Sequence, residues 1–250
     1  VGLVPLSVLL DAGRHYLTKQ GRSLGVSDAD LIKIAVRTLG LDELSPFDPE
    51  KRVIEYAIRD GASKRLVDMT VEEIVHETAS ESPAPGGGSV AAAVGALGAA
   101  LGTMVANLSS HKRGWDDRWE EFSKVAVAGK RCHDELLHLV DEDTEAFNRI
   151  MAAWKAEEAH RAAAIQDATR YAIEVPLRVM RTSLEAMGIC EAMVEKGMEA
   201  SLSDAAVGAL CIRTAVLGAG LNVRINAQDL EDSTAKAKFL ADAGALEDEA

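Results

Sequence analysis

The sequence predicts an all-α protein: a helical bundle of long antiparallel helices with a small, partly helical N-terminal appendage. Aromatic residues make up only 4% of the 250 residues, and no run of alternating apolar and polar residues marks a strand. Apolar residues instead recur at spacings of three and four, the pattern of a helix with one buried face. An uncharged run rich in Ala and Gly over residues 90–108 indicates a helix that is buried inside the protein.

The first sixty residues contain two clear helical patterns. One runs from Leu6 to Lys19, and the other runs from Asp28 to Leu39 with Ser27 as its N-cap. The stretch from Arg52 to Ile58 fits either a short strand or a helical turn.

A linker over residues 61–65 is predicted to divide the chain into an N-terminal part, 1–60, and a helical domain, 66–250. The helical domain opens with Thr70, which is followed three residues later by Glu73. This spacing predicts a capping box and a helix that runs to about residue 78.

A loop rich in proline and glycine precedes the uncharged run, with the sequence Ser82-Pro83-Ala84-Pro85-Gly86-Gly87-Gly88-Ser89. We expect Ser89 to cap a helix over residues 89–109. Such an entry presents free backbone N–H groups and the positive end of the helix dipole to an anion. Glycines at spacings of three and four in this helix also leave one face open to a neighbouring helix. Two roles, tight packing and ligand binding, are therefore both possible for the loop residues Pro85, Gly86, Gly87, Gly88 and Ser89.

A long helix is predicted over residues 118–154. Its apolar stripe includes Phe122, Val125, Gly129, Cys132, Leu136, Val140, Phe147, Ile150 and Trp154. The position on this stripe between Val140 and Phe147 is occupied by Asp143. An acidic residue on a buried seam is costly unless it is paired or used. The period of the helix thus separates Asp143 from Asp141, which points elsewhere.

Two further helices are predicted over 161–186 and 188–197, and Pro176 should kink the first. The last long helix begins after residue 203 and brings Asn222 and Asn226 to one face, one turn apart. We expect the tail from Asp229, which is rich in Ala and acidic residues, to fray.

Composition excludes several classes of function. The net charge of −13 argues against nucleic acid as a partner. The uncharged run lacks flanking aromatic and basic anchors, so it predicts no membrane span. Three widely separated cysteines indicate reduced thiols in a cytoplasmic protein. The sequence has neither the His and Cys spacing of a metal site nor the lysine of a P-loop.

The segment from Ser82 to Asn107 closely resembles the signature of the formiminotetrahydrofolate cyclodeaminase and methenyltetrahydrofolate cyclohydrolase family. Further matches follow in order: Val140-Asp141-Glu142-Asp143-Thr144-Glu145-Ala146-Phe147, Glu174-Val175-Pro176-Leu177, Ser203-Asp204 and Asn222-Val223-Arg224-Ile225-Asn226. Together they cover residues 66–232. Residues 1–60 resemble the C-terminal end of glutamate formiminotransferase through Val4-Pro5-Leu6, Lys19-Gln20-Gly21-Arg22-Ser23 and Pro46-Phe47-Asp48-Pro49. In some proteins that enzyme is fused ahead of the cyclodeaminase.

The resemblance implies an enzyme that converts 5-formiminotetrahydrofolate to 5,10-methenyltetrahydrofolate and ammonia in histidine degradation. A tetrahydrofolate derivative would be the substrate, with no prosthetic group. Lys112 and Arg113 would meet the tail of a polyglutamylated folate, or else lie in a solvated turn. The alternatives are a methenyltetrahydrofolate cyclohydrolase and, in another class, a non-catalytic oligomerisation module of a formiminotransferase fusion. The glycine faces and long seams predict a homodimer or a higher homo-oligomer.

The resemblance also assigns roles to single residues. Asp143 matches the family's acidic catalytic position, and Asp141 is the other aspartate of that motif. From the residues alone, Asp143 could instead form a buried ion pair with an arginine such as Arg178 or Arg213.

The remaining candidates also have structural alternatives. Asn222 and Asn226 could bond a pterin-like ring or satisfy backbone groups. Glu174 could face the substrate or bond backbone that Pro176 frees. The family usually has a threonine where this chain has Ile173, which weakens a direct role at that position.

Overall fold

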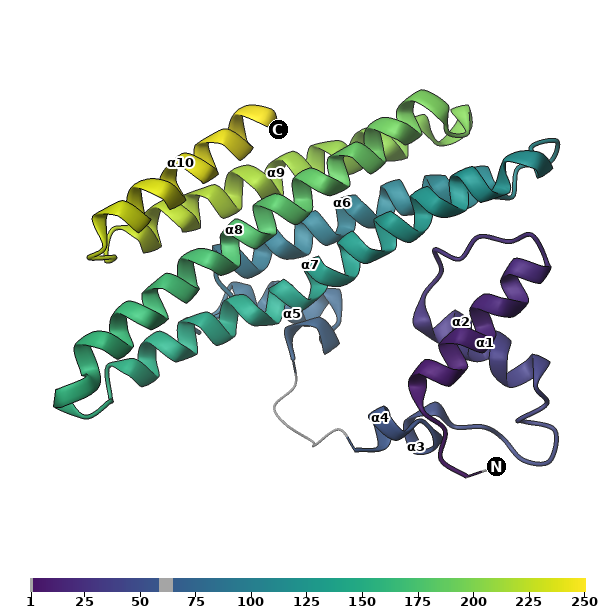
Figure 1. Ribbon diagram of the computed structural model, residues 1–250, viewed down its shortest axis with the longest axis horizontal. Coiled ribbons are helices and arrows are strands. Elements are labelled where there is room, and N and C mark those ends of the chain that lie inside the picture. Colours follow the sequence, from purple (N-terminus) through teal and green to yellow (C-terminus); the bar gives the residue numbers. More distant parts are fainter. Residues whose placement is uncertain (1, 59–64) are drawn as a thin grey trace.

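The computed structural model describes residues 2–58 and 65–250, and these residues form an all-α fold, as the sequence predicts. Figure 1 shows long helices running side by side, with a smaller N-terminal group of helices at one side. The α-helices of the described residues are α1 (Leu6–Lys19), α2 (Asp28–Thr38), α3 (Pro49–Arg52), α4 (Ile54–Ala57), α5 (Val71–Thr78), α6 (Gly87–Ser110), α7 (Trp119–Ala153), α8 (Glu158–Lys196), α9 (Leu202–Ala227) and α10 (Ser233–Glu249). Short 3₁₀ turns are η1 (Leu66–Asp68), η2 (Asp116–Arg118) and η3 (Glu199–Ser201).

Four helices, α6 to α9, form the bundle, and the glycines of α6 explain how closely they pack. A Cβ at Gly95 would lie 2.8 Å from Ser183 Oγ, and one at Gly98 would lie 2.7 Å from the carbonyl oxygen of Gly208. No side chain fits at these distances. The glycines therefore serve tight packing, because they let α8 and α9 lie directly against one face of α6.

The start of α6 differs from the prediction by two residues. Gly86 is the N-cap, and Ser89 lies inside the first turn. The Ser89 side chain is therefore free to bond elsewhere. The capping box at Thr70 is present as predicted, with Glu73 as its partner.

Helix α8 corrects one expectation, because residues 158–196 form one continuous helix instead of two. Gly188 is exposed and lies inside it, where a glycine costs only about 1 kcal/mol. Pro176 is buried within α8, and the carbonyl of Ala172 loses its helical donor there. Asn226 Nδ2 on α9 donates to that carbonyl at 2.7 Å, so a side chain replaces the missing N–H.

The C-terminal tail does not fray, contrary to the prediction. Asp232 caps α10 by accepting from the N–H of Ala235, and Ala243 is fully buried. Arg181 on α8 pairs with Asp242 at 2.9 Å, and Arg224 on α9 pairs with Glu247. The local composition of α10 specifies a helix only weakly. Ion pairs with α8 and α9 therefore hold this helix in place.

The stripe predicted on α7 is mostly correct. Phe122, Cys132, Leu136 and Val140 are buried, but Trp154 is 60% exposed. The helix ends at residue 153, so Trp154 falls just beyond the packed seam.

The N-terminal part packs against one end of the bundle. Residues 52–58 form helical turns on both sides of Val53, which makes an isolated parallel bridge with Val4. Ser23 is fully buried, and its hydroxyl donates to Asn107 Oδ1 on α6 at 2.5 Å. Residues 61–64 of the predicted linker lie outside the described residues, and residue 65 directly precedes η1.

Two segments of the described chain are long and apolar enough to cross a membrane: α6, and the stretch Glu199–Ala227. In the bundle, 61% of the most apolar window of α6 is buried, against 39% for the second stretch. α6 thus has the burial of a core helix. α9 instead keeps an exposed apolar stripe, made of Val207, Leu210, Leu217, Leu221 and Ile225.

Candidate functional site

The Asp143 carboxylate lies against the first turn of α6. Its Oδ2 accepts from both the backbone N–H and the hydroxyl of Ser89, each at 2.8 Å. A Cβ at Gly88 would lie 2.6 Å from the carboxyl carbon, so only glycine fits there. The glycine loop and the acidic motif, more than fifty residues apart in sequence, therefore form one structural unit.

The environment of Asp143 shifts its acidity. Burial raises the pKa of this carboxyl, and the two hydrogen bonds from Ser89 oppose part of that rise. A carboxyl whose pKa moves toward neutrality is better suited to accept a proton and return it. The ion pair with Arg178 that the sequence left open is not formed, because Arg178 instead pairs with Glu135 at 2.7 Å. Arg213, the other arginine considered, is exposed on α9.

A polar cavity of about 150 Å³ opens beside Asp143. It brings together the glycine loop, α7, α8 and the end of α9. Its lining comprises Pro83, Ala84, Gly86, Gly87, Gly88, Asp143, Thr144, Ala146, Phe147, Ile150, Ala172, Asn222 and Asn226. The sequence candidates Gly86 to Gly88, Asp143, Asn222 and Asn226 thus share one cavity.

The two asparagines of this cavity have different partners. Asn222 Nδ2 donates to the carbonyl of Gly218 at 3.0 Å, and a Cβ at Gly87 would lie 3.3 Å from that nitrogen. The Asn222 amide therefore packs directly on the glycine loop. Asn226 donates one amide N–H to the carbonyl of Ala172, which is the structural contact considered from sequence, and it also lines the cavity.

Thr144 is a cavity residue that sequence reasoning missed. Among the residues that the structure describes, its buried hydroxyl oxygen has no hydrogen-bond partner. Two other mid-helix threonines donate to the carbonyl four residues back: Thr103 to Ala99 and Thr214 to Leu210. The only sequence signal for Thr144 is its position next to Asp143.

Asp141 has a different place. Its Oδ1 accepts from the backbone N–H of Leu66 at 2.8 Å, which ties η1 to α7. The two aspartates of the motif therefore point to different surroundings, and only Asp143 lines the polar cavity. This is the division that the apolar stripe predicts.

Three predicted residues lie away from the cavity. Glu174 is exposed on α8 and does not line it. Lys112 and Arg113 follow the far end of α6, which is about 36 Å long for its 24 residues. The Lys112 ammonium lies 3.7 Å from the ring centre of Trp115, as expected for a structural turn.

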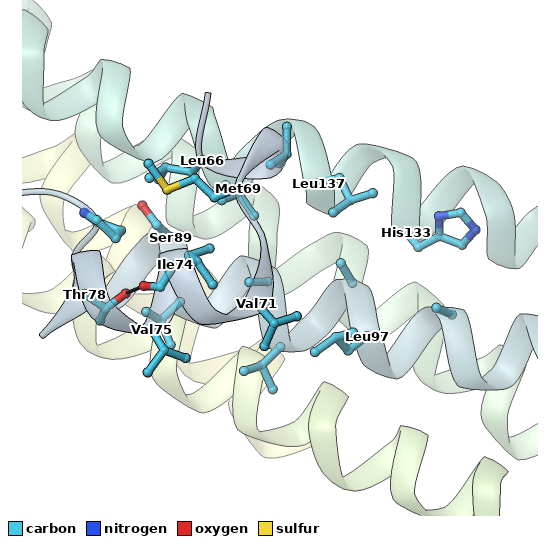
Figure 2. Close-up of a pocket in the computed structure, with 18 of the residues that line it drawn as sticks. Leu66, Met69, Val71, Ile74, Val75, Thr78, Ser89, Leu97, His133 and Leu137 are labelled. Carbon is cyan, nitrogen blue, oxygen red and sulfur yellow. Dashed lines mark hydrogen bonds between the residues drawn. The ribbon is translucent and has the colours of Figure 1, made fainter. Parts of the chain in front are cut away.

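Next to the glycine loop lies an apolar groove of about 610 Å³ (Figure 2). Its walls come from η1, α5, α6 and α7, and Pro85 and Ser89 lie at the loop end. Ser89 thus lines the groove while its hydroxyl binds Asp143 of the polar cavity.

Comparisons with known proteins identify the family of this chain. Residues 70–245 match the family model described as formiminotransferase-cyclodeaminase, and residues 1–59 match the formiminotransferase domain. The chain is 38% identical over 245 residues to formimidoyltransferase-cyclodeaminase of Rattus norvegicus, which covers 95% of this chain. It spans only 45% of that relative's length.

Two shorter relatives are covered almost completely. Methenyltetrahydrofolate cyclohydrolase of Methylorubrum extorquens is 35% identical over 190 residues, covering 71% of this chain and 91% of that protein. The crystal structure of formiminotetrahydrofolate cyclodeaminase from Thermotoga maritima superposes with a TM-score of 0.67 at 29% identity. That match covers 72% of this chain and 89% of the other. The chain therefore belongs to the formiminotransferase-cyclodeaminase family.

Proposed function

We propose that this chain is a cyclodeaminase that converts 5-formiminotetrahydrofolate to 5,10-methenyltetrahydrofolate and ammonia. The observation that carries the proposal is the Asp143 carboxylate, partly buried in a polar cavity and held by two hydrogen bonds from Ser89. The match to a formiminotransferase domain over residues 1–59 supports the same reaction. A formiminotransferase would supply the formiminotetrahydrofolate that this domain consumes.

The chemistry needs one group that can hold positive charge and move a proton. The protonated formimino group on N5 is an amidinium cation, which a carboxylate stabilises. N10 attacks the formimino carbon and forms the five-membered ring. Asp143 takes the proton from N10 and gives it to the amine, so the C–N bond breaks and ammonia leaves. The charge is conserved, since the amidinium becomes the methenyl cation.

The rest of the cavity would position the substrate. Asn222 and the free hydroxyl of Thr144 offer polar groups for the edge of a pteridine, and Phe147 offers an apolar wall. Holding N10 next to the formimino carbon supplies the proximity part of the rate enhancement. This scheme needs only side-chain and backbone groups of the protein. That the enzyme uses no prosthetic group stays a prediction.

A methenyltetrahydrofolate cyclohydrolase is the second candidate. The relative from Methylorubrum extorquens, which this chain covers over 91% of its length, favours it. Opening the methenyl ring with water would need the same carboxylate as a general base. A non-catalytic oligomerisation module is the third candidate, and the intact Asp143 and glycine loop argue against it.

Two assays on the full chain separate these candidates. Formation of methenyltetrahydrofolate from formiminotetrahydrofolate is followed by absorbance, with ammonia measured in parallel. Hydrolysis of methenyltetrahydrofolate is measured on the same protein. We expect turnover in the first assay. Turnover in the second assay alone would make the chain a cyclohydrolase, and turnover in neither would leave the oligomerisation module.

We further propose that the chain works in the cytoplasm as a homodimer or higher homo-oligomer. Cys132, Cys190 and Cys211 are free thiols, which suits a reducing compartment. The exposed apolar stripe on α9 suits a second copy of the chain. Leu210→Glu should lower the mass measured by light scattering, whereas Val194→Glu on α8 should not. Equal masses for both variants would argue against this stripe as the interface.

A further inference from the structure

The apolar groove beside the glycine loop is built almost entirely from aliphatic side chains. α5 forms one wall with Val71, Ile74 and Val75, and α6 forms another (Figure 2). Thr78, Ser89 and His133 are the polar residues among those that line it. A volume of about 610 Å³ falls within the range of about 300–1,000 Å³ that is usual for small-molecule sites.

The groove follows one face of α6 away from Ser89. Ala93, Leu97 and Ala100 continue that face at spacings of four and three, and all three line the groove. With a rise of 1.5 Å per residue, Ala93 lies about 6 Å and Ala100 about 16 Å along the helix from Ser89. The groove therefore leads outward from the residue that holds Asp143.

The α5 wall of the groove is largely exposed to solvent. None of the residues of α5 is buried, and Val71 and Val75 are 81% and 59% exposed. Leu97 on the opposite wall is 65% exposed. Apolar side chains this exposed, facing a groove next to the candidate site, are suited to cover an apolar ligand.

The chemistry of the proposed reaction says which ligand part belongs there. The reacting carbon bridges N5, on the pteridine, and N10, on the p-aminobenzoyl arm of the folate. A carboxylate that acts on this carbon must lie between the pocket for the pteridine and the pocket for the arm. The Ser89–Asp143 pair joins two such pockets, because Ser89 lines the apolar groove and Asp143, which its hydroxyl binds, lines the polar cavity.

Resting on the cyclodeaminase function proposed above, we infer that the apolar groove between α5 and α6 binds the p-aminobenzoyl arm of the folate substrate. The pteridine then occupies the polar cavity beside Asp143. The aromatic ring of the arm lies on Ala93 and Leu97, and its amide continues along the groove toward Ala100.

Two ligands that share the pteridine test the inference. Tetrahydrofolate carries the p-aminobenzoyl arm with its glutamate, and 6-methyltetrahydropterin lacks both. Binding of each is measured by calorimetry to the full chain and to two groove variants. Ala93→Trp fills the groove near Ser89, and Leu97→Glu adds a charge at an exposed position where folding is not at risk. Val194→Glu, on an exposed apolar position of α8, is the matched control for the charge.

We expect both groove variants to weaken tetrahydrofolate binding at least tenfold and to leave 6-methyltetrahydropterin binding unchanged. Val194→Glu should change neither. Equal effects on the two ligands, or none on either, would overturn the assignment of the groove. A changed mass in light scattering with unchanged affinities would instead assign the groove to a second copy. If the wild-type chain binds neither ligand, the proposed function itself fails.

Discussion

Asn226 on α9 donates its side-chain N–H to the carbonyl of Ala172 on α8, which Pro176 leaves without its helical donor. Two motifs that are fifty residues apart in sequence therefore depend on each other structurally. The proline frees an acceptor at the polar cavity, and the asparagine satisfies it. An unsatisfied buried carbonyl would cost about 1–3 kcal/mol.

This relationship predicts how two substitutions combine. Asn226→Ala should lower the free energy of unfolding by about 1–3 kcal/mol in the wild-type background, because the Ala172 carbonyl loses its donor. In a Pro176→Ala background the helix supplies the N–H, so the same substitution should cost clearly less. Urea denaturation of the four proteins measures both costs. Equal costs in the two backgrounds would show that Asn226 acts independently of Pro176.

The two aspartates of the acidic motif should behave differently. Asp143→Asn keeps size and shape but removes the proton transfer, so the rate of methenyltetrahydrofolate formation should fall about 100- to 10,000-fold in a folded protein. Asp141 accepts a hydrogen bond from the N–H of Leu66 and does not line the cavity, so Asp141→Asn should affect the rate far less. Side-by-side kinetics decide the matter. An inactive Asp141→Asn beside an active Asp143→Asn would reverse the assignment.

Gly88 of the loop and Gly188 of α8 provide a matched pair. A Cβ at Gly88 would lie 2.6 Å from the carboxyl carbon of Asp143, whereas one at Gly188, which does not line the polar cavity, would meet nothing within 4 Å. Gly88→Ala should therefore displace the carboxylate and lower the rate by about 100-fold, as misplacement of a reacting group by about 1 Å does. Gly188→Ala should stay close to wild type in rate. Similar kinetics for the two variants would mean that the loop yields and the carboxylate keeps its place.

The sequence predicted the position of Asp143 because the heptad-like stripe of α7 is periodic and local. It did not predict what Ser89 does. Ser89 was expected to cap a helix, but α6 begins at Gly87, and the serine side chain turns to Asp143 instead. The start of a glycine-rich helix is weakly specified by local residues. Contact with α7 decides it.

Two other features were hidden for similar reasons. Thr144 carries no pattern of its own, and its free hydroxyl becomes visible only in the assembled cavity. The C-terminal helix α10 has a composition that suggests fraying. Arg181 and Arg224, on two other helices, hold it through Asp242 and Glu247, and such long-range pairs cannot be read from a local window.

The raised pKa of Asp143 predicts how stability depends on pH. Because the folded protein binds this proton more tightly than the unfolded chain, Asp143 stabilises the fold below its ordinary pKa of 3.8. That stabilisation is lost as pH rises through the folded-state pKa. The unfolding free energy of wild type relative to Asp143→Asn should therefore fall from pH 3.8 upward and then level off. A constant difference across this window would mean that the pKa of Asp143 is not raised.

The contact between the N-terminal part and the bundle predicts a last effect, on stability and not on chemistry. Asn107 on α6 accepts from the Ser23 hydroxyl at 2.5 Å and donates to the carbonyl of Gly25 at 2.8 Å. Ser23 is fully buried, so Asn107→Ala leaves its hydroxyl without an acceptor and the Gly25 carbonyl without this donor. We expect a loss of about 1–3 kcal/mol in unfolding free energy.

The matched control for this effect is Asn148→Ala, at an exposed asparagine of α7 that should stay within about 0.5 kcal/mol of wild type. Asn107 lies near the far end of α6 from Asp143, so the rate at saturating substrate should be unchanged in Asn107→Ala. Urea denaturation and the methenyltetrahydrofolate assay on the same preparations separate the two readouts. A loss of rate without a loss of stability would mean that the N-terminal part contributes to the reaction, because docking of residues 20–30 would then matter at the site rather than for the fold.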